Sequence, residues 1–142
     1  MSLAVASSSY YQIIDAVLGR FDLLSRFDLV YSAEDEKLGK PYPAIYLSAA
    51  RKLGVDPSEG VAIEDSRHGV RSAKSAGYRC VAVPQERYVD RAGYHEAEVV
   101  LRSLAEVDGI LWRRLLVADG DALPLAGSAS QLDGRSRSAV RG

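Results

Sequence analysis

Between Leu3 and Leu116 the sequence alternates short apolar runs with longer segments in which apolar residues recur at helical spacing. Short continuous apolar runs are typical of strands buried on both faces, as in a parallel sheet. Such runs predict strands at residues 3–6, 27–31, 61–64, 79–83 and 97–101. The alternation therefore predicts an α/β domain with a parallel sheet.

Helices are predicted between these runs. The first is expected after the serines at 7–9, whose hydroxyls can cap a helix, and ends near Gly19. Prolines are tolerated in a first turn, so the second helix is expected to begin at Pro41 or Pro43 and to end at Gly54. A third helix is expected over 67–76, before Gly77, and a last one over 104–116.

Polar and small residues dominate from about Ala118 onward. Such a segment cannot bury enough apolar surface to offset the entropy of ordering it. We therefore expect one domain over residues 1–117 and a disordered tail over 118–142.

Composition narrows the functional classes. The 142 residues allow one domain with a core, and a net charge of −1 gives no electrostatic reason to expect nucleic acid or an anionic membrane as a partner. The apolar runs are too short to span a bilayer, and the first residues lack a leader pattern. Cys80 is the only cysteine and lies in an apolar run, so we expect an inert buried thiol and a reducing, cytoplasmic environment.

Polar groups that could bind a phosphate and a cation follow two of the predicted strands. Glu64 and Asp65 end the third strand just before a helix, a position that suits an oxygen-ligated Mg²⁺. Neighbouring strand residues point to opposite faces, so one of the two is expected to ligate directly and the other indirectly. The alternative is that Asp65 or Ser66 only caps the helix.

Lys40 and the serines complete the candidate set. Lys40 precedes Pro41, which favours an extended backbone that can aim the ammonium into a cleft, where it would neutralise phosphate charge. Ser7 ends the first strand and can donate to a phosphoryl oxygen, while Ser8 and Ser9 offer amides at a helix start. An ordinary surface lysine and a helix cap are the alternatives.

These three motifs, in this order, resemble the last three motifs of the haloacid dehalogenase-like hydrolases, especially the sugar-phosphatase and β-phosphoglucomutase-like branch. The resemblance rests on Ser7, on Gly39-Lys40-Pro41-Tyr42-Pro43, and on Glu64-Asp65-Ser66 with the glycine and alanines behind it. It implies a Rossmann-like core, with Ser7 and Lys40 as catalytic residues, and Ser7, Ser8 and Lys40 as phosphate ligands. It also implies Asp65 as the direct Mg²⁺ ligand, with Glu64 in an indirect role, and a small phosphorylated metabolite as substrate.

The family's first motif is an Asp-x-Asp that carries the nucleophile and the general acid and base, and it is not found before Ser7. The later Asp119-Gly120-Asp121 does not follow a buried strand, so we do not expect it to replace that motif. We therefore expect the C-terminal part of such an enzyme, inactive alone, without the central first strand and the cap domain.

Strands left without a neighbour invite pairing with another chain. The resemblance places the first strand between the strands that end here at Ser7 and at Glu64, so we expect a second chain or a swapped dimer to complete the sheet. Two other functions remain open: a non-catalytic module that binds phosphate or Mg²⁺, and an interaction protein in which the motifs are relics.

Overall fold

The computed structural model describes residues 1–85 and 91–116, and its elements follow the predicted alternation. The strands are β1 (Ala4–Ser7), β2 (Leu29–Ser32), β3 (Val61–Glu64), β4 (Arg79–Ala82) and β5 (Val99–Val100). The α-helices are α1 (Tyr11–Arg20), α2 (Ala44–Leu53), α3 (Arg67–Ser75) and α4 (Gly109–Leu116). The predicted tail and Asp119-Gly120-Asp121 lie outside the described residues.

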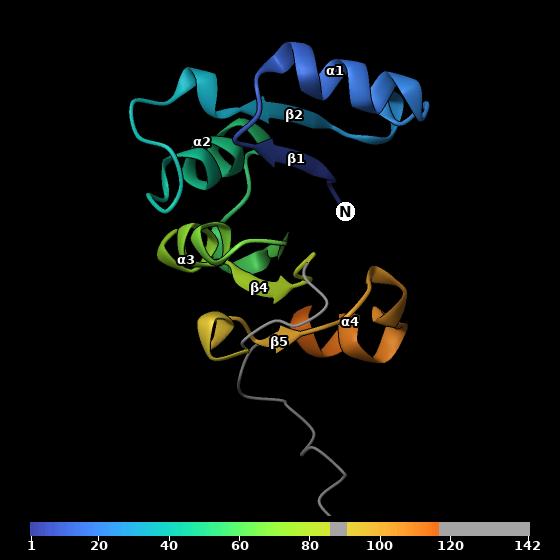
Figure 1. Cartoon of the computed structure of the whole chain (residues 1–142), viewed down its shortest axis with the longest axis vertical. Helices are drawn as coiled ribbons and strands as arrows, with labels where there is room; N and C mark the ends of the chain where they lie inside the picture. Colours follow the sequence, from blue (N-terminus) through green and yellow to red (C-terminus); the bar gives the residue numbers. More distant parts are fainter. Residues whose placement is uncertain (86–90, 117–142) are drawn as a thin grey trace, which may run out of the picture.

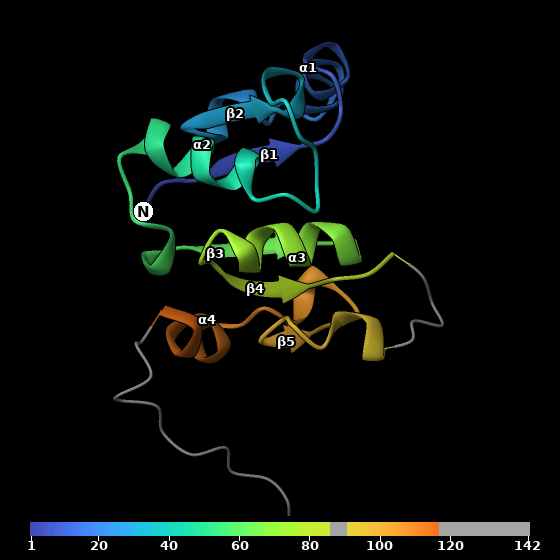
Figure 2. The same ribbon diagram turned by 90° about the vertical axis from the view of Figure 1, so that its left-hand side faces the viewer.

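The parallel strands form two sheets (Figure 1). β1 pairs with β2, while β3, β4 and β5 form the second sheet in that order, and every pairing is parallel. Within residues 1–85 and 91–116 no strand pairing joins β1 to β3, although the two lie at the facing edges of their sheets and point the same way (Figure 2). We call the interval between these two unpaired strand edges the slot.

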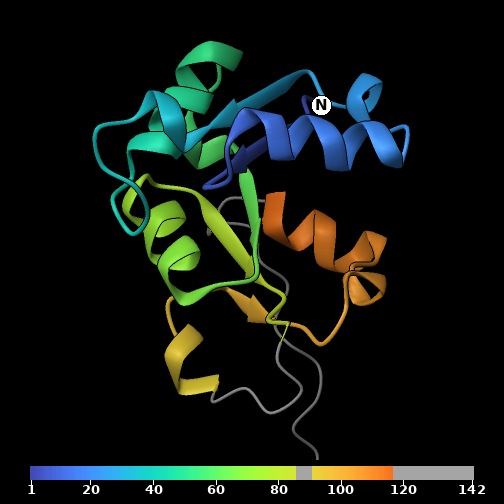
Figure 3. The ribbon, with the colours of Figure 1, turned by 45° about the horizontal axis from the view of Figure 1, so that its top comes forward.

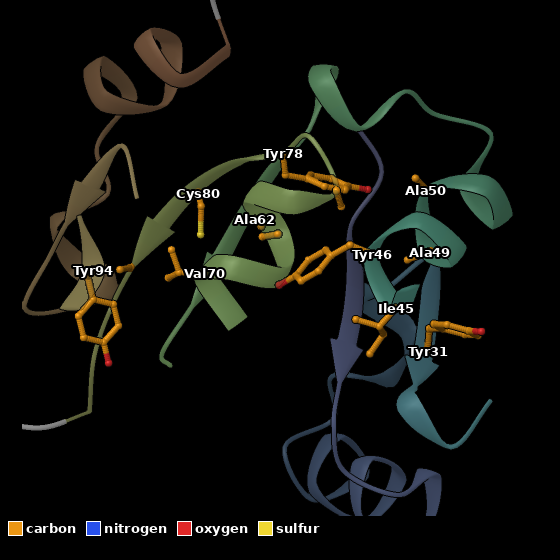
Figure 4. Packing of buried hydrophobic residues seen from close by; sticks show 13 residues of the cluster. Tyr31, Ile45, Tyr46, Ala49, Ala50, Ala62, Val70, Tyr78, Cys80 and Tyr94 are labelled. Carbon is orange, nitrogen blue, oxygen red and sulfur yellow. The ribbon is translucent and has the colours of Figure 1, made fainter. Parts of the chain in front are cut away.

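One face of both sheets is covered by α2 and α3. Their apolar residues form a single buried cluster with residues of β2, β3 and β4 (Figure 4). Ile45 of α2 and Val70 of α3 are both 1% exposed, and Cys80 of β4 is fully buried, as predicted. Because this cluster reaches Tyr31 on one sheet and Ala62 on the other, it holds the two sheets together across the slot.

The opposite face carries α1 and α4, which lie apart from each other (Figure 3). The buried residues of α1 are Ile14 and Leu18, and α4 buries Leu115. Much of the apolar surface of these helices remains exposed, unlike that of α2 and α3.

Several predicted boundaries differ from the structure. The second strand begins at Leu29 rather than at residue 27, and the fifth comprises only Val99–Val100. The last helix begins at Gly109, because Ser103 and Glu106 form a capping box around a separate 3-10 turn, Leu104–Glu106. The carboxylate of Asp108 then accepts from the amides of Ile110 and Leu111 at the true helix start. At α1 the N-cap is Tyr10, which makes no side-chain capping bond, so the predicted capping of this helix by the serines at 7–9 is wrong.

Among the described helices, none has the length and apolar character needed to cross a bilayer.

Candidate active site at the carboxyl ends of β1 and β3

A pocket of about 530 Å³ lies at the carboxyl ends of β1 and β3. The structure brings all the candidate residues to it, and its lining includes Ser7, Ser8, Lys40, Glu64 and Asp65. In α/β sheets the carboxyl ends of strands are where ligands bind. Residues from three separate parts of the sequence thus converge on one open pocket.

Glu64 is a buried carboxylate, 7% exposed, that faces the covered side of β3. Its Oε1 accepts from both the Lys40 ammonium and the Tyr46 hydroxyl. Burial, followed by the charge of Glu64, raises the pKa of Tyr46, so this hydroxyl stays neutral and donates. Two donors on one carboxylate oxygen fix Glu64 and satisfy its charge in a poorly solvated place.

Gly69, in the first turn of α3, makes room for that carboxylate. A Cβ built at Gly69 would lie 1.8 Å from Oε2 of Glu64. The carboxylate therefore packs directly against the helix backbone, where only glycine leaves enough space.

Asp65 points to the other side and is exposed, as the alternation along a strand predicts. Its Oδ2 accepts from Gln85 Nε2 at 3.0 Å, and its backbone carbonyl accepts from the Tyr94 hydroxyl at 3.1 Å. The helix cap is supplied by Ser66, whose Oγ accepts from the amide of Gly69 at 3.0 Å. The capping role weighed for Asp65 therefore belongs to Ser66.

Lys40 links the two sheets. Its Nζ donates to Glu64 at the end of β3 and to the backbone carbonyl of Ala6 in β1, at 3.2 Å for the latter. The ammonium also lies 5.3 Å from the centroid of the Tyr46 ring, and the Lys40-Pro41 peptide bond is cis. Lys40 is thus held at the pocket wall by partners on both sides of the slot.

Ser7 Oγ accepts from the amide of Ser9 at 3.1 Å, which orders the turn after β1 and leaves the hydroxyl proton to donate elsewhere. Ser8 lines the pocket beside it. The helix α1 begins only at Tyr11, and the Tyr11 amide already donates to the carboxylate of Glu34. The first amide of that helix is therefore occupied by a protein carboxylate.

The residues present fit part of a magnesium site. Asp65 offers a carboxylate in an open pocket, and Mg²⁺ is bound in proteins through one or two carboxylates together with several waters. Glu64 is already engaged by two donors, which leaves it an indirect role. Residues 1–85 and 91–116 contain no group of three His, Cys, Asp or Glu side chains arranged to hold a metal.

Two residues of the site carry no signal that sequence reasoning recognised. Tyr46 stands on the apolar face of α2 and reads as a core residue, which its ring is. Gln85 follows the fourth strand at a position without a motif. Both act through a contact with a carboxylate on another element.

The sequence profile of haloacid dehalogenase-like hydrolases matches residues 1–83. The chain belongs to this family. It is 40% identical over 105 residues to hexitol phosphatase B of Escherichia coli K12, a match that covers 74% of the chain and 47% of that protein. Its identity to the protein YhcW of Bacillus subtilis is 36% over 108 residues, with 76% of the chain and 49% of that protein covered.

Solved structures of this family share the fold. CbbY from Rhodobacter sphaeroides in complex with phosphate superposes with a TM-score of 0.68 at 36% identity, covering 75% of the chain and 48% of CbbY. A CbbY variant in complex with xylulose-1,5-bisphosphate gives the same TM-score at 35% identity, covering 74% of the chain and 48% of that protein. The chain spans about half the length of these relatives.

Proposed function

We propose that residues 1–117 form the phosphate- and metal-binding part of a magnesium-dependent phosphatase that acts on a small phosphorylated metabolite, in particular a sugar phosphate. The observation that carries this proposal is the convergence of Ser7, Lys40 and Asp65 on one pocket at two strand ends. The substrate class is supported by the hexitol phosphatase among the relatives and by the sugar bisphosphate bound to CbbY.

Each residue has a role that its geometry supports. The Ser7 hydroxyl and the Ser8 segment would bind phosphoryl oxygens, and Lys40 would neutralise charge that develops on them. Asp65 would hold the magnesium ion, and Gln85 and Glu64 would keep Asp65 and Lys40 in position. The bound ion would supply further positive charge for the transferred phosphoryl group.

The aspartate that attacks phosphorus in this family would come from a strand in the slot. β1 and β3 present facing unpaired edges that run in the same direction, so one parallel strand between them would pair with both. Its carboxyl end would then open into the pocket, beside Lys40 and Asp65. We infer that a further polypeptide segment completes the sheet in this way.

The test reconstitutes the enzyme from two pieces. The chain is mixed with the half of E. coli hexitol phosphatase B that the match does not cover, and phosphate release is measured with Mg²⁺ over a panel of hexose and hexitol phosphates. We expect turnover only with both pieces and Mg²⁺. Asp65→Asn should lower it by about 100-fold or more, because a metal ligand is lost. Asp15→Asn, on an exposed position of α1, is the matched control and should leave turnover within twofold, about the range of a neutral surface change.

Turnover by the chain alone would contradict the requirement for an outside aspartate. Equal turnover in the Asp65→Asn and Asp15→Asn variants would contradict the metal-binding role. Phosphate binding without any turnover in the mixture would favour the alternative, a non-catalytic phosphate-binding module.

A further inference from the structure

Two serine hydroxyls are fully buried on elements next to the candidate active site. Ser32, at the end of β2, and Ser72, on α3, are both 0% exposed. A buried hydroxyl is costly unless it is hydrogen-bonded, and an alanine would fill nearly the same space without that cost. Among the described residues, those that line the pocket include neither serine. The two hydroxyls are therefore placed to act on the site through other residues.

The Ser32 hydroxyl holds the turn that follows β1. Its Oγ accepts from the amide of Glu34 at 3.1 Å, and it donates to the carbonyl of Ser9 at 2.7 Å. Because Ser32 pairs with Ser7 in the ladder of β1 and β2, this bond ties the turn to the neighbouring strand. The amide of Ser9 in turn donates to Ser7 Oγ at 3.1 Å. Ser32 thus acts on the Ser7 hydroxyl through Ser9.

Ser72 makes a bond of the same kind to the turn that contains Lys40. A serine inside a helix can bond back to a carbonyl one turn earlier, but Ser72 Oγ donates to the carbonyl of Tyr42, thirty positions away, at 2.6 Å. The amide of Tyr42 donates to the carbonyl of Gly39 at 3.1 Å, which closes the turn around Lys40. Ser72 therefore anchors the backbone of this turn, while other partners hold the Lys40 ammonium.

Each buried hydroxyl donates to the carbonyl that lies two residues after a candidate phosphate-binding residue, Ser7 or Lys40. Groups that bind a ligand must be held to within about 0.5 Å of their working position by packing and hydrogen bonds around them. We propose that Ser32 and Ser72 are positioning residues of the candidate active site, each holding one phosphate-binding turn in place. The inference rests on the proposed function for the roles of Ser7 and Lys40, and it adds the groups that hold their backbones.

Amide hydrogen exchange of the full chain, measured by NMR, tests each bond at the turn that it holds. The amides of Ser9 and Tyr42 report the two turns. The amide of Val83, bonded to the end of β3 at 2.7 Å, reports global unfolding. The variants are Ser32→Ala and Ser72→Ala, and each serves as a control for the other.

Ser48→Ala is the matched control for the loss of a buried hydroxyl. Ser48 is 7% exposed on α2, and its Oγ accepts from Arg51 of the same helix at 2.8 Å. Because this bond stays within one helix, the variant should leave exchange at both turns within about twofold of the unsubstituted chain.

We expect Ser32→Ala to speed exchange at Ser9 by about tenfold or more and to leave Tyr42 within twofold, because the carbonyl of Ser9 loses its buried donor. Ser72→Ala should do the reverse. Rates are compared with that of Val83, since a loss of global stability speeds all three amides together. Acceleration of both turns by either variant, or of neither turn, would overturn the proposal.

Binding of inorganic phosphate is the functional readout of the same variants. It is followed through the Ser8 amide in the presence of Mg²⁺. Ser32→Ala and Ser72→Ala should each weaken it by about threefold or more, because a binding group is displaced, whereas Ser48→Ala should not change it. Loosened turns with unchanged phosphate affinity would overturn the positioning role.

The two readouts also separate this inference from the proposed function. An unsubstituted chain that binds no phosphate would contradict the proposed function. The pattern of exchange in the two variants would then still decide whether the buried hydroxyls hold their turns.

Discussion

The two faces of this molecule differ although the helices on both faces carry apolar residues at helical spacing. On the face covered by α2 and α3, Ile45 is 1% exposed, whereas on the face of α1 and α4, Ile13 is 52% exposed. α2 buries five of its residues, and α1 buries two. The difference shows that an apolar helical pattern marks a surface that needs a partner, and that only one face finds its partners within the described residues.

The difference between the two faces is tested most directly by making the same substitution on each of them. Ile45→Ala removes a fully packed side chain and should lower the free energy of unfolding by about 2–5 kcal/mol. Ile13→Ala should lower it by less than about 0.5 kcal/mol, because the side chain is half in water already. Urea unfolding of both variants measures the difference, and similar costs would mean that the open face is packed in solution.

A second test concerns the close packing of Gly69 against the Glu64 carboxylate in the candidate active site. Gly69→Ala would place a methyl group against the Glu64 carboxylate, displacing it from Lys40 or Tyr46, and should cost about 1–3 kcal/mol. Gly39→Ala is the control, since a Cβ there meets nothing within 4 Å. Thermal unfolding compares the two, and a neutral Gly69→Ala would show that Glu64 is not held as tightly as its contacts indicate.

A smaller effect than that of Ile45→Ala or Gly69→Ala is expected at Glu98, which directly precedes β5. Partial burial raises its pKa, but the bonds from Lys74 and from the amide of Cys80 outweigh this, and the net pKa lies below the usual value of 4.5. A lowered folded pKa gives stability that is present above about pH 4.5 and lost as the pH falls through the folded pKa.

Glu98→Gln should therefore cost about 0.5–1 kcal/mol at pH 7, a modest value because the ion pair is partly exposed, and the cost should shrink toward pH 3. The measurement is the free energy of unfolding of both proteins against pH. A cost that does not change with pH would assign Glu98 a packing role only.

Local pattern predicted the order and type of the elements because each apolar run is bounded by its own turn residues. It misplaced the start of α4, since Ser103 and Asp108 can each begin a helix and the sequence does not say which turn continues. The sequence also does not distinguish Ile13 from Ile14, which are adjacent apolar residues of the first helix. Which of the two is covered depends on a neighbour that no local pattern describes.

The candidate site, like the fold, could be predicted from the sequence only in part. The strand ends and motif order predicted which residues meet in the pocket. The hydrogen bond from Tyr46 to Glu64 could not be predicted, because a tyrosine among apolar residues of a helix has an adequate role as a core residue. The hydrogen bond from Gln85 to Asp65 could not be predicted either, because it joins residues twenty positions apart on separate elements.

The position of the Lys40 ammonium depends on the spacing of the two sheets. Its ammonium is tied to a carbonyl of β1 and to a carboxylate of β3, so any change in the distance between those strands must stretch, break or redirect one of the two bonds. The electrostatic potential felt by an anion in the pocket is thereby coupled mechanically to how far apart the sheets stand.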